Sequence, residues 1–297
     1  MPDSSWLWAL FTVIAAASQT VRNATQRELT ATLGTAGATH VRFLFGLPFA
    51  LMFLFAVVIA GGETLPRPPA MFWAWVLDGA LAQIAATALM LAAMNDRSFV
   101  VVYAYIKTEP VQAALFGLIF LGDAVTLPMA AAILIATAGV VMMALKPGTA
   151  LGLRATLLGL GAGGMFALSA VGFRGAILSL GLPSYLTAAT FTLVVGLVIQ
   201  CVVLSLYLWL RDPAVLRAIF RHWRPSLFAG FLGALASQFW FLAFALATAA
   251  SVRTLALVEV LFAQAISAFA FKQATTPREA AGIALILIGV ALLVWTY

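Results

Sequence analysis

The sequence predicts an all-α integral membrane protein of ten transmembrane helices, arranged as two inverted five-helix repeats. Three observations predict this fold class: an apolar composition, ten apolar runs of membrane-spanning length, and an internal repeat. Of the 297 residues, 64% are hydrophobic and 9% are charged, and the mean hydropathy is +1.09. A soluble domain of this length does not reach such values, so we expect a multi-pass membrane protein.

The apolar runs set the expected number of helices. A bilayer core about 30 Å thick is spanned by roughly 20 apolar residues in a helix. Residues 1–5 contain Asp3 and no Lys or Arg, so the first run is predicted to be a helix rather than a secretory signal. The ten runs lie at residues 5–28, 35–60, 70–93, 98–121, 127–145, 155–178, 184–210, 225–248, 252–271 and 278–296.

An internal repeat relates residues 1–147 to residues 148–297. A shift of 150 residues places the fourth and fifth runs on the ninth and tenth without a gap. Because each half has five spans, the second copy must enter the membrane from the opposite side, as in many secondary transporters. The matched residues include Glu109 with Glu259, Thr126 with Thr276, Gly139-Val140 with Gly289-Val290 and, at shifts of 154 and 151, Gly79 with Gly233 and Ser18 with Ser169.

The fourth run carries charge where a bilayer is thickest. Lys107 and Glu109 cost about 2.5–3.5 kcal/mol each to insert, so we expect each to have a partner or a task. Pro110 removes a backbone donor and predicts a kink. On a helix Lys107 shares a face with Tyr103, whereas Glu109 points the opposite way. We therefore expect no simple Lys107–Glu109 ion pair, although a structural pair of Lys107 with Asp78 stays open.

The repeat sorts the polar residues into two classes. A residue present in both copies serves the shared scaffold, so Glu109 and Glu259 are predicted to be structural or gating residues. Pro110 is predicted to be one as well, because it kinks the helix. A polar residue found in one copy is free to contact substrate. This second class contains Tyr103 (matched by Arg253), Lys107 (by Leu257), Asp78 (by Leu232), Gln238 (by Ile84) and Trp240 (by Ala86). We expect the face of Tyr103 and Lys107 to line a cavity.

Basic residues bear on the orientation. On the side of the two termini, loops are predicted to hold Arg67, Arg174 and Arg253, whereas the opposite side holds twelve basic residues, including those of the amphipathic segment 211–224. By the positive-inside rule, both termini would lie outside. The formal net charge of +6 is thus expected to report topology and lipid headgroups rather than nucleic-acid binding.

Short motifs at repeat-related positions resemble the drug/metabolite transporter superfamily in its ten-helix, EamA-type form. They are Glu109-Pro110, Leu121-Gly122-Asp123, and Gly139-Val140-Val141 with its copy Gly289-Val290-Ala291. The family's turn after Leu-Gly carries a glutamate, where this chain has Asp123, and the second copy reads Lys272-Gln273. The resemblance implies ten helices around a central cavity and export of small metabolites from the cytoplasm, with both termini in the cytoplasm. Within the superfamily the chain is most similar to bacterial aromatic amino-acid exporters of the cell inner membrane.

The first functional hypothesis is therefore an exporter of amino acids with aromatic or large apolar side chains, working as a monomer in the bilayer without a cofactor. A zwitterion needs a cation for its carboxylate, acceptors for its ammonium group and an apolar wall. Lys107 is the candidate cation. Ser18, Gln19, Asp78, Gln83 and Gln238 are candidate hydrogen-bonding residues, and Tyr103, Phe166 and Trp240 are candidate stacking residues, with ordinary helix or lipid packing as the alternative.

The second hypothesis is a proton-coupled exporter of cationic drugs or another metabolite. Such a transporter needs a membrane carboxylate that alternates between a proton and a cation, and Glu109 or Asp78 could take that role. The positive charge of Lys107 argues against it.

A third hypothesis is a membrane-embedded enzyme or assembly subunit. The sequence offers no metal-ligand cluster and no nucleophile with a base, and the glycines at 159–164 lack the Lys-Ser/Thr of a phosphate loop. Those glycines are expected to serve helix packing. His40 and His222 are expected to be interfacial, and Cys201 is the single cysteine. We therefore expect no catalytic residue, metal or nucleic-acid partner.

Overall fold

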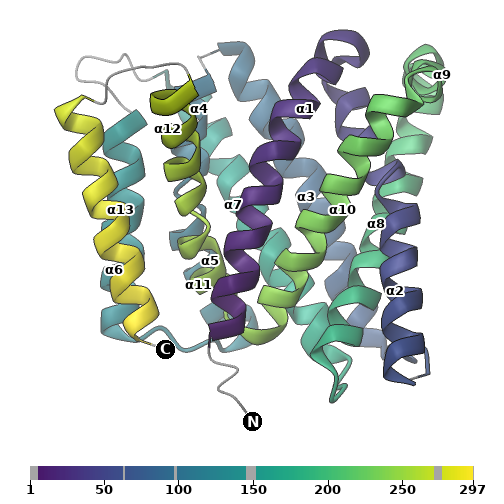
Figure 1. The fold of residues 1–297 in the computed structure, drawn as a ribbon, viewed down its shortest axis with the longest axis horizontal. Coiled ribbons are helices and arrows are strands. Elements are labelled where there is room, and N and C mark those ends of the chain that lie inside the picture. The colour runs from purple at the N-terminus through teal and green to yellow at the C-terminus, as the bar shows by residue number, and fades with distance from the viewer. Residues whose placement is uncertain (1–5, 63, 97–98, 145–151, 271–275, 297) are drawn as a thin grey trace. The chain divides into compact units, whose positions relative to one another are not determined.

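The computed structural model describes residues 6–62, 64–96, 99–144, 152–270 and 276–296. Every regular element in these ranges is helical (Figure 1). The elements are α1 (Leu7–Leu44), α2 (Leu47–Gly61), α3 (Ala70–Asp96), α4 (Phe99–Ile106), α5 (Glu109–Phe116), the π-helical turn η2 (Gly117–Leu121), α6 (Leu127–Ala144), α7 (Leu153–Ser179), α8 (Tyr185–Arg211), α9 (Pro213–Arg221), α10 (Trp223–Leu246), α11 (Ala249–Leu255), α12 (Val258–Ala270) and α13 (Pro277–Trp295).

Seven segments of the described chain are long and apolar enough to cross a membrane. The chain is therefore an all-α protein with the character of a multi-pass membrane protein. These segments are Thr32–Gly61, Ala70–Met94, Leu127–Ala144, Leu153–Ser179, Tyr185–Arg211, Trp223–Leu246 and Pro277–Trp295.

Three of the ten predicted runs are absent from that set for local reasons. The apolar start of α1, Leu7–Arg22, is shorter than a full span. The fourth run is divided into α4, α5 and η2, and the ninth into α11 and α12, so neither is one continuous long helix. The predicted number of ten helices stays a prediction.

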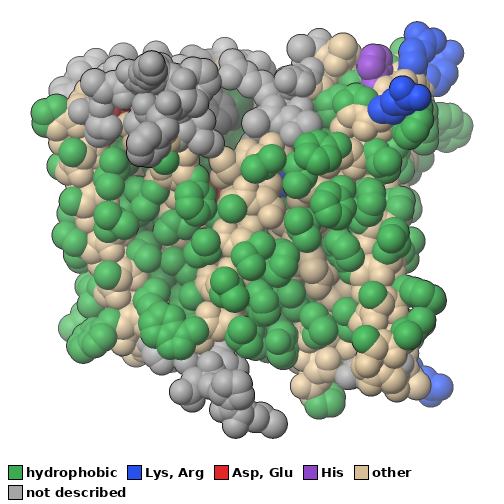
Figure 2. Space-filling view, viewed as in Figure 1, with side chains coloured by type: hydrophobic (Ala, Val, Ile, Leu, Met, Phe, Trp, Pro, Cys, Tyr) green, Lys and Arg blue, Asp and Glu red, His purple; other side chains and the backbone are tan. Residues whose placement is uncertain are grey.

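The outer faces of the helices are apolar. On α2, the side chains of Met52, Phe55 and Ile59 are 64%, 68% and 63% exposed. A soluble monomer rarely exposes contiguous apolar surface of this kind, whereas lipid solvates it. Hydrophobic side chains cover most of the face drawn in Figure 2. The exposed apolar faces therefore support a lipid-facing surface.

Two compact units, each formed from separated parts of the sequence, make up the structure. Unit 1 comprises Met1–Val13, Leu81–Val171 and Ala247–Tyr297, and unit 2 comprises Ile14–Ala80 and Gly172–Leu246. Each unit contains chain from both predicted halves. The predicted boundary at residues 147 and 148 lies outside the described residues, as do Lys272 and Gln273.

In unit 1, α6 and α13 pack side by side (Figure 1). A Cβ on Gly139 would lie 2.7 Å from the carbonyl oxygen of Gly282, and a Cβ on Gly289 would lie 2.7 Å from that of Ala132. These two contacts exchange under the 150-residue shift, because 139 becomes 289 and 132 becomes 282. The close approach explains the glycines, as small residues let membrane helices meet backbone to backbone.

Threonines begin both of these helices. The Thr126 hydroxyl accepts a hydrogen bond from the Met129 amide at 3.4 Å before α6, and the Thr276 hydroxyl accepts one from the Glu279 amide at 3.3 Å at the start of α13. Each hydroxyl satisfies an amide that has no partner inside the helix. The matched threonines therefore have matched structural roles.

In unit 2, α8 packs against α2, α9 and α10. The short helix α9 is amphipathic, as predicted: Ile219 is fully buried, whereas Phe220 and Arg217 are exposed. Basic side chains and a histidine gather at the end of the unit where α9 lies (Figures 1 and 2). This composition is typical of a helix at a membrane–water interface.

The structure corrects several local predictions. The first helix continues past residue 28 and is interrupted at Gly34, which has φ of 65°. Arg174 and Arg253, predicted to lie in loops, lie within α7 and α11. Neither residue therefore counts among the basic residues in loops on the side of the two termini. His40 is fully buried, and its Nε2 lies 2.9 Å from the hydroxyl of Ser205. Its place at the membrane interface stays a prediction.

Candidate functional site

Unit 1 contains two broken helices. Helix α4 stops at Ile106, and α5 starts at Glu109 after a turn at Lys107 and Thr108. Helix α11 stops at Leu255, and α12 starts at Val258. Broken helices at corresponding positions of two repeats mark the binding region in many secondary transporters.

The backbone tightens in the same way at both breaks. The amide of Thr108 donates to the carbonyl oxygen of Tyr105 at 3.2 Å, and the amide of Leu257 donates to that of Thr254 at 3.1 Å. Each bond spans three residues instead of the four of an α-helix. Pro110 removes a donor at the first break, but its counterpart is Val260. The second break therefore forms without a proline.

A glutamate lies in the first turn after each break. Glu109 starts α5, Glu259 is the second residue of α12, and both side chains are buried. The amino end of a helix carries a partial positive charge from its unpaired amide groups, so it favours a carboxylate there. The breaks thus create two helix starts inside the unit, each with an acidic side chain.

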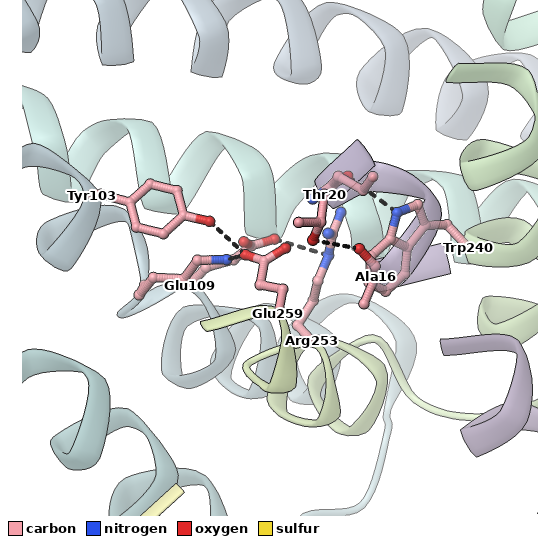
Figure 3. A network of polar contacts seen from close by, with 9 residues as sticks. Ala16, Thr20, Tyr103, Glu109, Trp240, Arg253 and Glu259 are labelled. Carbon is pink, nitrogen blue, oxygen red and sulfur yellow. Dashed lines mark hydrogen bonds and ion pairs between the residues drawn. The ribbon is translucent and has the colours of Figure 1, made fainter. Parts of the chain in front are cut away.

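The Glu259 carboxylate binds two side chains of α4 and the following turn. The hydroxyl of Tyr103 donates to its Oε1 at 2.6 Å, and the Lys107 ammonium forms an ion pair with the same oxygen. The Lys107 Nζ also lies 4.8 Å from the centre of the Tyr103 ring. Figure 3 shows the Tyr103 hydroxyl pointing at the Glu259 carboxylate. The predicted Tyr103–Lys107 face is thus directed at the second broken helix.

The Glu109 carboxylate, at the first break, binds a side chain of the helix before the second break. Its Oε1 lies 2.9 Å from Nε of Arg253 on α11, and both side chains are largely buried (Figure 3). Under the 150-residue shift, Tyr103 becomes Arg253 and Glu259 becomes Glu109. The two contacts therefore exchange under this shift.

The formal charges of the four ionic groups cancel. Lys107 and Arg253 neutralise Glu259 and Glu109, respectively. The expectation that Lys107 and Glu109 do not form a simple pair is confirmed. The carboxylate that neutralises Lys107 is that of Glu259, in place of the Asp78 partner left open by the sequence. Removing one member of a buried pair leaves an uncompensated charge, so the four groups depend on one another.

Glycines of α7 let that helix approach the first break. A Cβ on Gly159 would lie 2.7 Å from Cβ of Tyr105, and one on Gly163 would lie 3.1 Å from the carbonyl oxygen of Ile106. The Thr156 hydroxyl, on the same helix, donates to the Tyr105 hydroxyl at 3.0 Å. The prediction that the glycines at 159–164 serve helix packing is confirmed for Gly159 and Gly163.

The remaining predicted site residues of unit 1 lie elsewhere in it. Phe166 packs against an apolar cluster that contains Ile106 and Ala162. Gln83 is half-buried on α3, and its carbonyl oxygen accepts a hydrogen bond from the Thr87 hydroxyl at 3.0 Å. Their roles as substrate contacts stay predictions.

In unit 2, two predicted residues meet directly. The indole Nε1 of Trp240 on α10 donates to Oε1 of Gln19 on α1 at 3.2 Å. Ser18 is the half-buried neighbour of Gln19. The Gln238 amide donates to the Thr190 hydroxyl at 2.7 Å. These contacts join α10 to α1 on one side and to α8 on the other.

Asp78 lies at the contact between α3 and α7. A Cβ on Gly172 would lie 2.6 Å from its Oδ2, so only a glycine leaves room for this carboxylate. This Oδ2 is buried and has no hydrogen-bond partner among the described residues. Asp78 is thus a carboxylate whose binding capacity is not filled by the described part of the chain.

Sequence reasoning missed Arg253 as a site residue. The repeat had matched it with Tyr103, but its charge suggested a loop. Reading the match as a shared position would have made Arg253 a candidate site residue beside Tyr103. Within the described ranges, no three His, Cys, Asp or Glu side chains cluster as metal ligands do.

Comparison with known proteins gives the fold. No protein-family model and no curated protein sequence matches the chain. A solved crystal structure of another protein matches 97% of this chain and 94% of its own, with a TM-score of 0.70 and 14% sequence identity. At that identity the likeness shows a shared fold.

Proposed function

We propose that the chain is a secondary transporter of the drug/metabolite transporter superfamily, in the ten-helix EamA-type form with two inverted repeats. It exports small metabolites across the cell inner membrane by alternating access. Its substrates are amino acids with aromatic or large apolar side chains. The observation that carries this proposal is the exchange of contacts between two broken helices, Tyr103 with Glu259 and Arg253 with Glu109.

That exchange supports an inverted repeat. Two segments related by a two-fold axis in the membrane plane present the same contact twice, once toward each side of the bilayer. The glycine contacts of α6 and α13 exchange in the same way. Two independent pairs of contacts are therefore consistent with one axis, and such a repeat gives a transporter two gates of related structure.

The ion pairs suggest how substrate and gate are coupled. Lys107 is the predicted ligand for the substrate carboxylate, and Glu259 holds it in the conformation described. A zwitterion can replace both partners, because its carboxylate can take Lys107 while its ammonium group takes Glu259. Binding would then loosen the contact between α4 and α12. In this account Glu109 and Arg253 keep the second contact closed.

One observation favours a second candidate, a proton-coupled exporter of cations. The Oδ2 of Asp78 is buried with no hydrogen-bond partner in the described part of the chain, and a membrane carboxylate of that kind can alternate between a proton and a cation. Glu259 also neutralises Lys107, which reduces the repulsion between Lys107 and a cationic substrate. Asp78→Asn would abolish drug export in this case.

An exchange screen tests the proposal. Purified protein is reconstituted in liposomes loaded with one unlabelled amino acid, and uptake of labelled phenylalanine, tryptophan, leucine, lysine and glutamate is measured. We expect exchange of the first three and a loss of at least tenfold in Lys107→Ala. Exchange of a cationic drug that depends on a proton gradient, with no amino-acid exchange, would support the second candidate instead.

A further inference from the structure

Two arginines of α1 lie together against α10 in unit 2. A Cβ on Gly233 of α10 would lie 3.5 Å from Cγ of Arg42 and 3.6 Å from Cδ of Arg22. One point on α10 is therefore in contact distance of both side chains. Arg22 is buried and Arg42 is half-buried. Two positive charges held this close repel each other.

Arg42 has no acidic partner among the described residues. Its guanidinium carbon lies 4.4 Å from the centre of the Phe43 ring, a cation–π contact that leaves the guanidinium hydrogen-bond donors available. A guanidinium inside a membrane protein is costly and is normally paired. Repulsion between the two arginines falls when an anion lies between them.

The counterpart of Arg22 in the second half of the sequence carries no charge. At a shift of 151, Arg22 falls on Phe173, and at 154 Gly79 falls on Gly233. Gly79 does meet Phe173, with a Cβ at 2.9 Å from its ring, just as Gly233 meets Arg22. The Phe173 ring packs on Phe241 with centres 4.6 Å apart. One copy therefore fills this place with an aromatic ring, and the other fills it with an arginine.

The neighbouring contact fixes the position of Arg22 along α10. Gln19, one turn before Arg22 on α1, binds Trp240, two turns after Gly233 on α10. Figure 3 shows the Trp240 indole beside the α1 turn of Ala16 and Thr20. The two helices are thus tied together next to the arginines, which holds the pair in place.

From these observations we infer that Arg22 and Arg42 form a binding site for the carboxylate of a small organic anion. The guanidinium group binds a carboxylate through two parallel hydrogen bonds, which an ammonium group cannot do. The identification of the ligand as the carboxylate of an amino-acid substrate rests on the proposed function. In the conformation described, Glu259 holds Lys107, and the arginine pair offers the carboxylate a second binding site.

Calorimetric binding to the purified protein tests the site. The probes are 3-phenylpropionate, which has the carboxylate alone, and phenethylamine, which has the amine alone. Wild type should bind 3-phenylpropionate at least tenfold more tightly than phenethylamine. Arg42→Gln and Arg22→Gln should each weaken 3-phenylpropionate by tenfold or more, while Arg224→Gln, an exposed arginine at the start of α10, should leave it unchanged.

Arg42→Lys distinguishes a loss of binding from a loss of folding. It retains the charge and loses the two-pronged geometry, so we expect a loss of roughly three- to tenfold. No binding of 3-phenylpropionate to wild type, or equal binding to wild type and Arg42→Lys, would overturn the inference. If 3-phenylpropionate binding depends on the arginines but no amino acid is exchanged in liposomes, the anion site stands and the proposed function fails. Amino-acid exchange that is unchanged in Arg42→Gln overturns the site alone.

Discussion

Tyr103 and Arg253 take equivalent places in two broken helices, and each contacts the glutamate that begins the other. The Tyr103 hydroxyl lies 2.6 Å from Glu259, and the Arg253 Nε lies 2.9 Å from Glu109. The position is shared although the residues differ in charge. Lys107, with Leu257 as its counterpart, supplies on one side the positive charge that arginine supplies on the other.

The shared position predicts that position 253 tolerates a tyrosine better than a leucine. Arg253→Leu removes the cation that neutralises Glu109, and breaking a buried pair costs about 3–5 kcal/mol. Arg253→Tyr restores a hydroxyl donor like that of Tyr103, so we expect a smaller loss, about 1–2 kcal/mol. Unfolding by SDS in mixed micelles measures both. Equal losses for the two variants would show that the positions are not equivalent.

The Lys107–Glu259 pair predicts energetic coupling. Lys107→Leu and Glu259→Gln should each destabilise the protein, and the double variant should lose less than the sum of the two. The coupling free energy from this double-mutant cycle should be at least about 1 kcal/mol, because the groups are in contact and buried. The same cycle between Lys107 and the exposed Arg67 should give a value near zero. Additive losses at positions 107 and 259 would contradict the pair.

The glycine contacts of α6 and α13 predict that alanine at position 139 or 289 lowers the stability by similar amounts. Gly139→Ala and Gly289→Ala each place a Cβ within 2.7 Å of a backbone atom of the partner helix, and such overpacking costs about 1–3 kcal/mol. Gly161→Ala on α7 is the control, because its nearest neighbour would be Leu89 at 3.7 Å, an ordinary contact. The midpoint of thermal unfolding should fall for the first two variants only. A similar fall for Gly161→Ala would mean that helix propensity, not packing, decides.

The membrane-spanning arrangement of unit 2 predicts that cysteines at its two ends are labelled from opposite sides of the membrane. Arg67 lies in the connector after α2, Arg217 lies on α9, and both are exposed. The end of α2 and the helix α9 lie toward opposite ends of unit 2 (Figure 1). In a Cys201→Ala background, Arg67→Cys and Arg217→Cys should react with a membrane-impermeant maleimide from opposite sides of an oriented vesicle. Labelling of both from one side would contradict the membrane-spanning arrangement of α2 and α8.

Helix positions could be predicted from the sequence to a large extent. Apolar runs fix where lipid-facing helices lie, and turns are marked by residues such as Gly62 and Gly122, whose φ values of 62° and 69° favour glycine. The break at the fourth run was predicted from Pro110 and its charges. The break at the ninth run was not, because Leu257 and Val260 are ordinary helix residues and the break depends on tertiary contacts.

Partners of the charged residues could be predicted less well. The repeat identified Glu109 and Glu259, but a sequence shift does not show that each glutamate faces the other copy. Arg174 and Arg253 were predicted to lie in loops, since arginine is rare inside membranes. The structure places both within helices. The sequence does not show which charged residues pair when they lie on helices that are distant in the chain.

Trans-stimulation tests the central claim of alternating access most directly. Liposomes with wild-type protein are loaded with labelled phenylalanine, and efflux is measured with and without unlabelled phenylalanine outside. A carrier returns faster when loaded, so we predict at least a severalfold faster efflux with outside substrate, and a strong reduction in Lys107→Ala. Efflux that is unaffected by outside substrate, or equal to that of protein-free liposomes, would contradict the account.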